Sequence, residues 1–166
     1  TYYLKNPEDI RDYILQYKDK MNVLFLENVD LTQEKNLFEG HNFRTVQLSA
    51  CKITKEQAWD LSFNNNVAEI SLTKGTLNAE NLTNLSLAGK TKIDLSYNAL
   101  GDSAIKSRLT MTHFTFTKEM NLAGNNLTDD VLTVFTEYTN ATALKVFDIS
   151  HNQITDEGLF RAYRVI

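Results

Sequence analysis

The sequence has few residues that cross-link a chain or break its secondary structure: its 166 residues include one cysteine, one proline and six glycines. A lone Cys51 excludes an internal disulfide, which fits a reducing compartment or a protein that does not rely on disulfides. We therefore expect a cytoplasmic protein. No Gly/Ser-rich or Pro-rich linker divides the chain, so we expect a single domain over residues 1–166.

Strong charge of one sign and long apolar runs are also missing. The net charge of -4 is mild and gives no reason to expect nucleic acid or an anionic membrane as partner. No apolar run approaches the roughly 20 residues of a membrane-spanning helix. No basic segment followed by an apolar stretch marks a signal peptide.

Residue types used in catalysis are present, but not in catalytic patterns. The three histidines lie far apart, and none has metal-ligand spacing with Cys51. Asp148, Ser150 and His151 have the residue types of a hydrolytic triad, yet neighbours on one strand rarely have triad geometry. No glycine-rich phosphate loop occurs. We expect no enzyme, no metal site and no cofactor.

What is present is a recurring apolar pattern, clearest in LKVFDISHNQITDEGL, residues 144–159. This stretch predicts a short strand, a tight polar turn at Asn152 and the start of a helix. Weaker copies run back to residue 21. Their last apolar positions are 31, 53, 77, 100, 127 and 154, at steps of 22, 24, 23, 27 and 27 residues. We expect six repeats over 21–166, the last incomplete.

The segments around the predicted strands carry helix signals. Asn6 and Pro7 predict a helix within residues 1–20, which is either a cap of the stack or the remainder of a truncated repeat that includes Leu4. Helix starts are expected after each strand, at Thr32, Thr54, Asn78, Asp102, Thr128 and Thr155, with a capping box from Thr54 to Gln57.

Two connections depart from this scheme. Leu82, Leu85 and Leu87 match the strand offsets, but Leu87 lies too close to the next strand, so residues 79–86 are expected to be helical. Residues 109–116 fit no clean helix, and we expect an irregular or extended connection with Phe114 and Phe116 buried.

A period of 20 to 29 residues with L-x-x-L-x-L-x-x-N-x-L resembles the leucine-rich repeat. The helical connections resemble the ribonuclease-inhibitor-like class, and NQITDEGL and LSACKIT resemble the cysteine-containing class. The asparagine- and lysine-rich repeats also resemble those of intracellular bacterial effectors, which would place the protein in a host cytosol. The resemblance implies an α/β solenoid, with a curved parallel sheet on its concave side and helices on its convex side.

The turn position of each repeat has a structural role in this pattern. An asparagine side chain there can bond backbone groups that would otherwise be buried without partners. The expected turn residues are Cys51, Asn98, Asn125 and Asn152. Val29 and Gly75 cannot supply such bonds, so we expect water or backbone shifts there and a less regular N-terminal half.

In this family, the strand residues between the leucines form the binding surface. Alternation in a strand turns these positions outward. The expected partner-binding residues are Phe25, Asn28, Gln47, Ser71, Lys74, Asp94, Tyr97, Asn121, Asp148 and His151. Phe25 and Tyr97 are the expected aromatic anchors, although Phe25 can equally pack under an N-terminal cap.

These observations predict a protein-interaction module that binds another protein through its concave face. One alternative is a GTPase-activating protein, as some inhibitor-like members are, which requires an exposed catalytic side chain that no motif here supplies. Another is a structural fragment of a larger multidomain protein. The sequence leaves the oligomeric state open.

Overall fold

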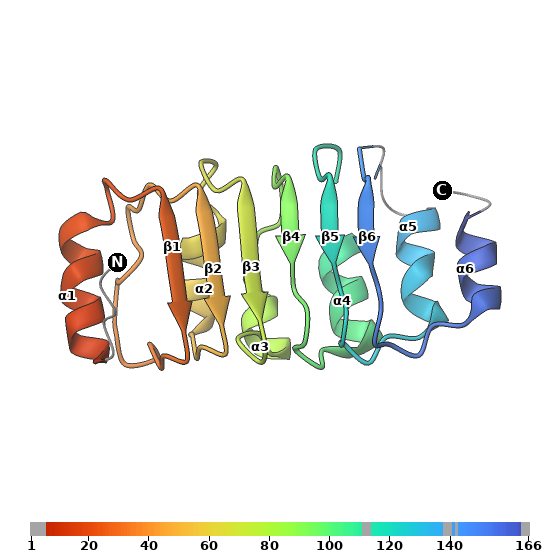
Figure 1. The fold of residues 1–166 in the computed structure, drawn as a ribbon, viewed down its shortest axis with the longest axis horizontal. Helices are drawn as coiled ribbons and strands as arrows, with labels where there is room; N and C mark the ends of the chain where they lie inside the picture. Colours follow the sequence, from red (N-terminus) through yellow and green to blue (C-terminus); the bar gives the residue numbers. More distant parts are fainter. Residues whose placement is uncertain (1–5, 111–113, 138–140, 142, 164–166) are drawn as a thin grey trace.

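The chain forms one six-stranded sheet in which every strand is parallel to its neighbours (Figure 1). The computed structural model describes residues 6–110, 114–137, 141 and 143–163. The strands follow one another across the sheet in sequence order: β1 Val23–Glu27, β2 Thr45–Ser49, β3 Glu69–Thr73, β4 Lys92–Asp94, β5 Glu119–Asn121 and β6 Val146–Asp148. The predicted repeats are therefore neighbours in space, and Ile93, Met120 and Phe147 face one another in register.

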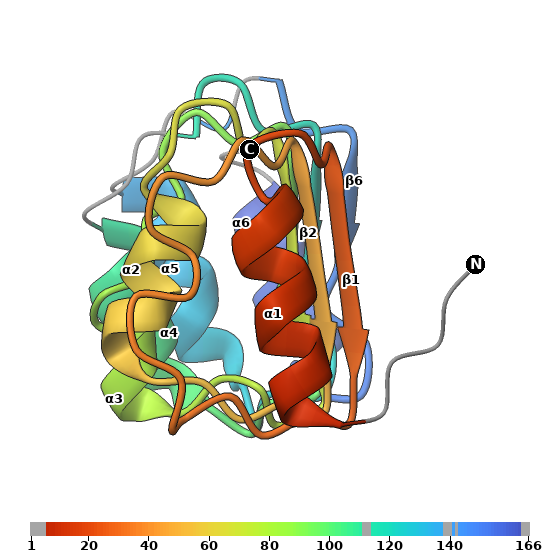
Figure 2. The ribbon, with the colours of Figure 1, turned by 90° about the vertical axis from the view of Figure 1, so that its left-hand side faces the viewer.

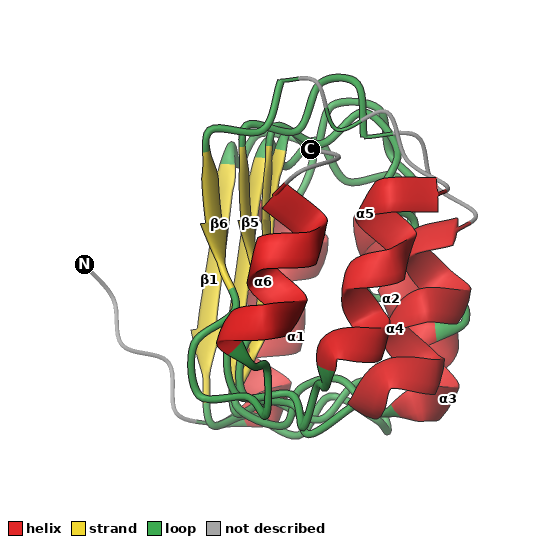
Figure 3. Ribbon diagram, turned by 90° about the vertical axis from the view of Figure 1, so that its right-hand side faces the viewer, coloured by secondary structure: helices red, strands yellow, loops and turns green. Residues whose placement is uncertain are grey.

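Helices lie on only one side of this sheet in the described residues (Figures 2 and 3). They are α1 Pro7–Tyr17, α2 Lys55–Ser62, α3 Ala79–Leu82, α4 Gly101–Thr110, the 3-10 helix η1 Asp129–Leu132, α5 Thr133–Glu137 and α6 Asp156–Tyr163. Helices α2 to α5 form the outer layer. Helices α1 and α6 lie at the two ends of the stack (Figure 1).

The core lies between sheet and helices because alternate strand residues point inward. Leu24, Val46, Ile70, Ile93 and Met120 occupy the same position in successive strands, and each is at most 1% exposed. Burying one such side chain contributes roughly 1.5 to 3 kcal/mol. No single repeat can bury its apolar face alone, so stacking is the condition for folding.

The predicted curvature of the solenoid is not confirmed, because the sheet is not strongly curled: seen along the stack, its strands lie nearly behind one another (Figures 2 and 3). Strong curvature needs a helix layer that is wider than the strand layer. Here the layer is thin: α3 spans four residues, and no helix follows β1 within residues 32–43. We therefore call the helix-free side of the sheet the open face.

The prediction of a helix that begins at Thr32 is wrong, since residues 32–43 contain no helix. The amide and the hydroxyl of Thr32 both bond the Asp30 carboxylate, at 3.0 and 2.6 Å. The residues that follow run through turns back to β2. This connection belongs to the shortest step, 22 residues, and has the least room for a helix.

The two unusual connections also differ from expectation. Helix α3 ends at Leu82 rather than residue 86, and the backbone continues through a turn so that Leu85 and Leu87 are buried. Helix α4 extends to Thr110, and residues 111–113 lie outside the described residues. Phe114 is buried as predicted, but the prediction for Phe116 is wrong, since its side chain is 66% exposed.

The expected caps are present. The Asn6 side chain accepts a hydrogen bond from the amide of Glu8 at 2.9 Å, at the start of α1. Thr54 and Gln57 form a reciprocal capping box at the start of α2. The reading of Leu4 as part of a truncated repeat lies outside the described residues. Within them, no helix is long and apolar enough to cross a membrane.

Candidate functional site

The open face carries the predicted binding residues in two lines across the sheet. The strand register places the first six side by side, in the order Phe25, Gln47, Ser71, Asp94, Asn121 and Asp148. The other four, Asn28, Lys74, Tyr97 and His151, follow the ends of their strands. The structure thus places six of the ten side by side across the sheet and the other four just beyond the strand ends.

Three residues of the first line are engaged in turns. The side-chain oxygens of Asp94, Asn121 and Asp148 each accept a hydrogen bond from the backbone amide two residues later, at 3.0, 2.9 and 2.9 Å. The hydroxyl and amide of Ser150 hold the pKa of the Asp148 carboxyl below its usual range. These side chains shape the exits of their strands, which limits their freedom to contact a partner.

The second line has an unusual backbone. The residue at this position is left-handed in every repeat, with φ between 53 and 65° at Asn28, Ala50, Lys74, Tyr97, Gly124 and His151. Five of these six are not glycine. A side chain in this conformation costs roughly 1 to 2 kcal/mol, although asparagine tolerates it better. The turn requires the conformation, and glycine would be the least costly residue there.

Tyr97 is the most prominent side chain of this line. Its ring lies directly on Gly124, where an added Cβ would come within 2.4 Å of Tyr97 Cδ1. The His151 ring, from the repeat after Gly124, is also near, with 5.9 Å between its centroid and that of the Tyr97 ring. The Tyr97 side chain remains 48% exposed. We call Tyr97, Gly124 and His151 the tyrosine platform.

The backbone holds the members of the platform at fixed spacing. The Tyr97 amide donates to the carbonyl of Ala123 at 2.8 Å, and the Gly124 amide donates to the carbonyl of Ser150 at 3.1 Å. Three successive repeats are thereby joined just beyond their strands. Tyr97 and His151 were predicted from the sequence, whereas Gly124, which leaves space for a ring from another repeat, was not.

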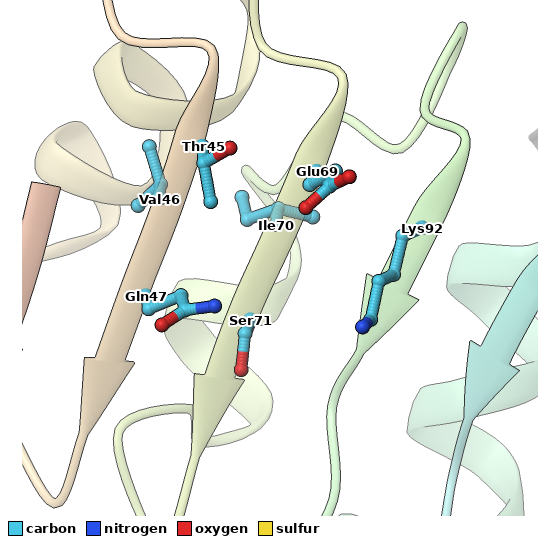
Figure 4. Close-up of a pocket in the computed structure, with 7 residues that line it drawn as sticks. All are labelled: Thr45, Val46, Gln47, Glu69, Ile70, Ser71 and Lys92. Carbon is cyan, nitrogen blue, oxygen red and sulfur yellow. The ribbon is translucent and has the colours of Figure 1, made fainter. Parts of the chain in front are cut away.

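The middle of the open face is shallow rather than hollow (Figure 4). A depression there has room for about one water molecule and is lined by Thr45, Val46, Gln47, Glu69, Ile70, Ser71 and Lys92. Beside it, Lys92 and Glu119 form an exposed ion pair at 3.5 Å. This region can contact a broad surface, but it does not enclose a small molecule.

The turn asparagines form a ladder beneath the sheet edge. The Asn125 side chain donates to the carbonyls of Leu95 and Leu122, and it accepts from the amides of Asn98 and Leu100. Asn98 and Asn152 make the same kinds of bond in their own repeats. Each amide thereby joins two repeats.

Sequence reasoning missed Thr76, which takes over this role where Gly75 occupies the turn position. The Thr76 hydroxyl donates toward the carbonyls of Leu48 and Thr73 and accepts from the amide of Cys51. A side chain, rather than the water or backbone shift expected there, meets these backbone groups. A hydrogen-bonding side chain directly after Gly75 was the sequence feature that could have indicated this role.

Cys51 and His41 are both buried. The Cys51 thiol contacts the carbonyl of Ser49 at 3.5 Å, and burial raises its pKa. His41 stacks on Phe43 and contacts the carbonyl of Asp60 at 2.9 Å, and burial lowers its pKa. Their contacts are those of structural residues.

The triad residue types do not form a relay in the structure. The Ser150 hydroxyl donates to the Asp148 carboxylate at 2.7 Å, as part of the strand-exit turn. Among the residues that the structure describes, no three His, Cys, Asp or Glu side chains are grouped so that they could hold a metal ion.

The comparison with protein families agrees with this architecture. The leucine-rich repeat family model matches residues 140–160, which include β6, Asn152 and the start of α6. No curated protein matches the chain. Together, the match and the all-parallel sheet support a leucine-rich-repeat protein. A leucine-rich repeat in turn suggests a protein-interaction module.

Proposed function

We propose that the protein binds another protein through its open face, with the tyrosine platform at the centre of the contact. The observation that carries the proposal is the placement of Tyr97, whose half-exposed ring is supported from below by Gly124. Large aromatic side chains at fixed positions contribute most to binding in protein interfaces. The contact would include the ten residues of the two lines.

The backbone at Tyr97 adds support to this choice. A tyrosine at φ 61° carries a strain that a glycine, as in the next repeat, would not. The turn imposes this conformation in every repeat, so what distinguishes Tyr97 is the large ring that it carries there. Since packing on Gly124 already restricts the ring, less conformational entropy is lost when a partner binds.

Phe25 is a second anchor in this proposal. It lies on the outer strand β1, and its side chain is 61% exposed. It therefore does not pack under the helix at that end of the stack, which was the competing expectation. Asp94, Asn121 and Asp148 contribute mainly by fixing the strand exits. Binding, without catalysis or a cofactor, is the activity that we propose.

The affinity for a partner tests the role of Tyr97. Partners are captured from a soluble extract on the immobilised chain, identified and purified, and their dissociation constants are measured by calorimetry. Tyr97→Ser should weaken binding about 30-fold, which corresponds to roughly 2 kcal/mol at a hot spot. The melting temperatures of the variants show whether each remains folded.

Phe63→Ser is the matched control. Phe63 follows α2 in the outer helix layer, stacks on Trp59 and is 57% exposed. It is thus a comparably exposed aromatic on the opposite side of the molecule. Equal affinities of the two variants, or a loss only for Phe63→Ser, would contradict binding through the open face.

We also propose that the protein is a secreted bacterial effector that acts in the cytosol of a host cell. The support is the resemblance of its asparagine- and lysine-rich repeats to those of such effectors. A translocation assay with a reporter fused to the protein, in its source bacterium, tests this point. A reporter that never reaches the host cytosol would contradict it.

A further inference from the structure

The C-terminal end of the stack is less well covered than the repeat before it. Met120, Leu122, Leu127 and Leu132 are at most 4% exposed. The residues 27 positions later, Phe147, Ile149, Ile154 and Leu159, occupy the same places in the last repeat. The first three are only partly buried, and Leu159 is 44% exposed.

Helix α6 does not close this end with a polar surface. It turns Gly158 and Ala162 inward and exposes Leu159 and Phe160, by 44% and 60%. A terminal repeat that ends a stack presents a polar outer face. The strand order also leaves β6 without a partner on its outer side among the described residues.

A series of hydrogen bonds between repeats stops at the same end. The Asp102 carboxylate accepts from the amide and the hydroxyl of Thr128, at 2.9 and 2.5 Å. The Asp129 carboxylate accepts from the same two groups of Thr155, at 2.7 and 2.5 Å. Asp156 is the next member of the series, and it is exposed, with no such partner in the described part of the chain.

The asparagine ladder is also open here. The Asn125 side chain accepts from the amides of Asn98 and Leu100, and the Asn152 side chain accepts from those of Asn125 and Leu127. The amides in the corresponding places of the last repeat are those of Asn152 and Ile154. Neither donates to a side chain within the described residues.

We propose that this end of the stack is a docking face for a further leucine-rich repeat. Its strand pairs in parallel with β6, its turn asparagine accepts from the amides of Asn152 and Ile154, and its helix-start threonine donates to Asp156. The argument is continuity: the same contacts join the preceding repeats, and the apolar positions left exposed are those that a neighbouring repeat covers. This face is separate from the open face and does not depend on the tyrosine platform.

An added repeat tests the proposal. The full chain is extended directly after Ile166 by a second copy of residues 140–166, which keeps the 27-residue spacing and places copies of Thr155 and Asn152 in the required positions. The melting temperature should rise by roughly 10 °C, because a complete inter-repeat interface is added to a small domain. An extension that carries alanine in place of those two copies should raise it much less.

Asp156→Ala distinguishes a specific interface from general stabilisation. In the original chain the substitution removes only a helix-start charge, whereas in the extended chain it also removes the bonds to threonine. The melting temperature should therefore fall several degrees further in the extended chain. Equal effects in both chains, or an extension that leaves the melting temperature unchanged, would overturn the proposal.

A second copy of the chain is the competing occupant. Light scattering of the original chain should show a monomer, and Leu159→Glu should leave it unchanged. A dimer that Leu159→Glu dissociates would overturn the proposal, because it would show that this end pairs with itself. Changes at Tyr97 should leave the rise in melting temperature on extension, and the monomeric state, unaltered.

Discussion

Lys90 is a buried lysine whose titration makes the stability of the fold depend on pH. Its side chain is 1% exposed, and Nζ donates to the carbonyl of Ser62 at 2.6 Å. Among the described residues no acid forms an ion pair with it. Burial lowers the pKa of Lys90 from its ordinary 10.5 to about 8.

The sign of the effect follows from the two pKa values. Between about pH 8 and 10.5 the unfolded chain binds more protons at this site than the folded chain, so the free energy of unfolding rises with pH. The full rise is about 3 kcal/mol, of which about 2 kcal/mol falls between pH 7 and 9.5. Below pH 7 the contribution of Lys90 is constant.

Lys90→Met isolates this contribution. Urea unfolding at intervals from pH 7 to 9.5 gives the free energy of unfolding of both proteins. The wild type should gain about 2 kcal/mol relative to Lys90→Met over this range. Lys92→Met, on the exposed face, is the matched control and should keep the alkaline rise. A constant difference between wild type and Lys90→Met would refute the reasoning.

Four further substitutions test the turn ladder and the platform. Asn125→Ala should lower the free energy of unfolding by about 3 kcal/mol, since several buried backbone groups lose their hydrogen-bond partner. Asn152→Ala, at the C-terminal end of the ladder, should lower it by less. Thr76→Val keeps the shape but loses three hydrogen bonds, and urea unfolding should show a loss of about 2 kcal/mol. Gly124→Ala should displace Tyr97 and strain the backbone, so partner affinity should fall as in Tyr97→Ser. Unchanged stability in Asn125→Ala or Thr76→Val, or unchanged affinity in Gly124→Ala, would contradict these roles.

The strands could be predicted well because the same spacing of apolar residues recurs in each repeat. Apolar residues at the inward positions of β4, β5 and β6 can be buried only if the three strands stack in register. The asparagines at 98, 125 and 152 combine a donor and an acceptor at fixed spacing, so their turns could be recognised. The prediction was less accurate after β1, where the connection is too short for the helix start that Thr32 indicated.

Other features depend on space between repeats and were not readable in one dimension. Gly124 is important because it has no side chain. The space that this leaves is needed only because the Tyr97 ring, 27 residues earlier, lies in the adjacent turn. The role of Thr76 could not be separated from that of many other threonines. Phe114 and Phe116 are the same residue type with similar flanking residues, yet the turn that contains them buries the first and exposes the second.

The asparagine ladder also determines how the molecule would respond to force. Its bonds join one repeat to the next along a single line, so tension applied at the C-terminus reaches each repeat in turn rather than all at once. Pulling would peel the stack in steps, each releasing about 27 residues or roughly 90 Å of extended chain. The resistance should drop where Thr76 replaces an asparagine, since a hydroxyl makes fewer cross-links than an amide.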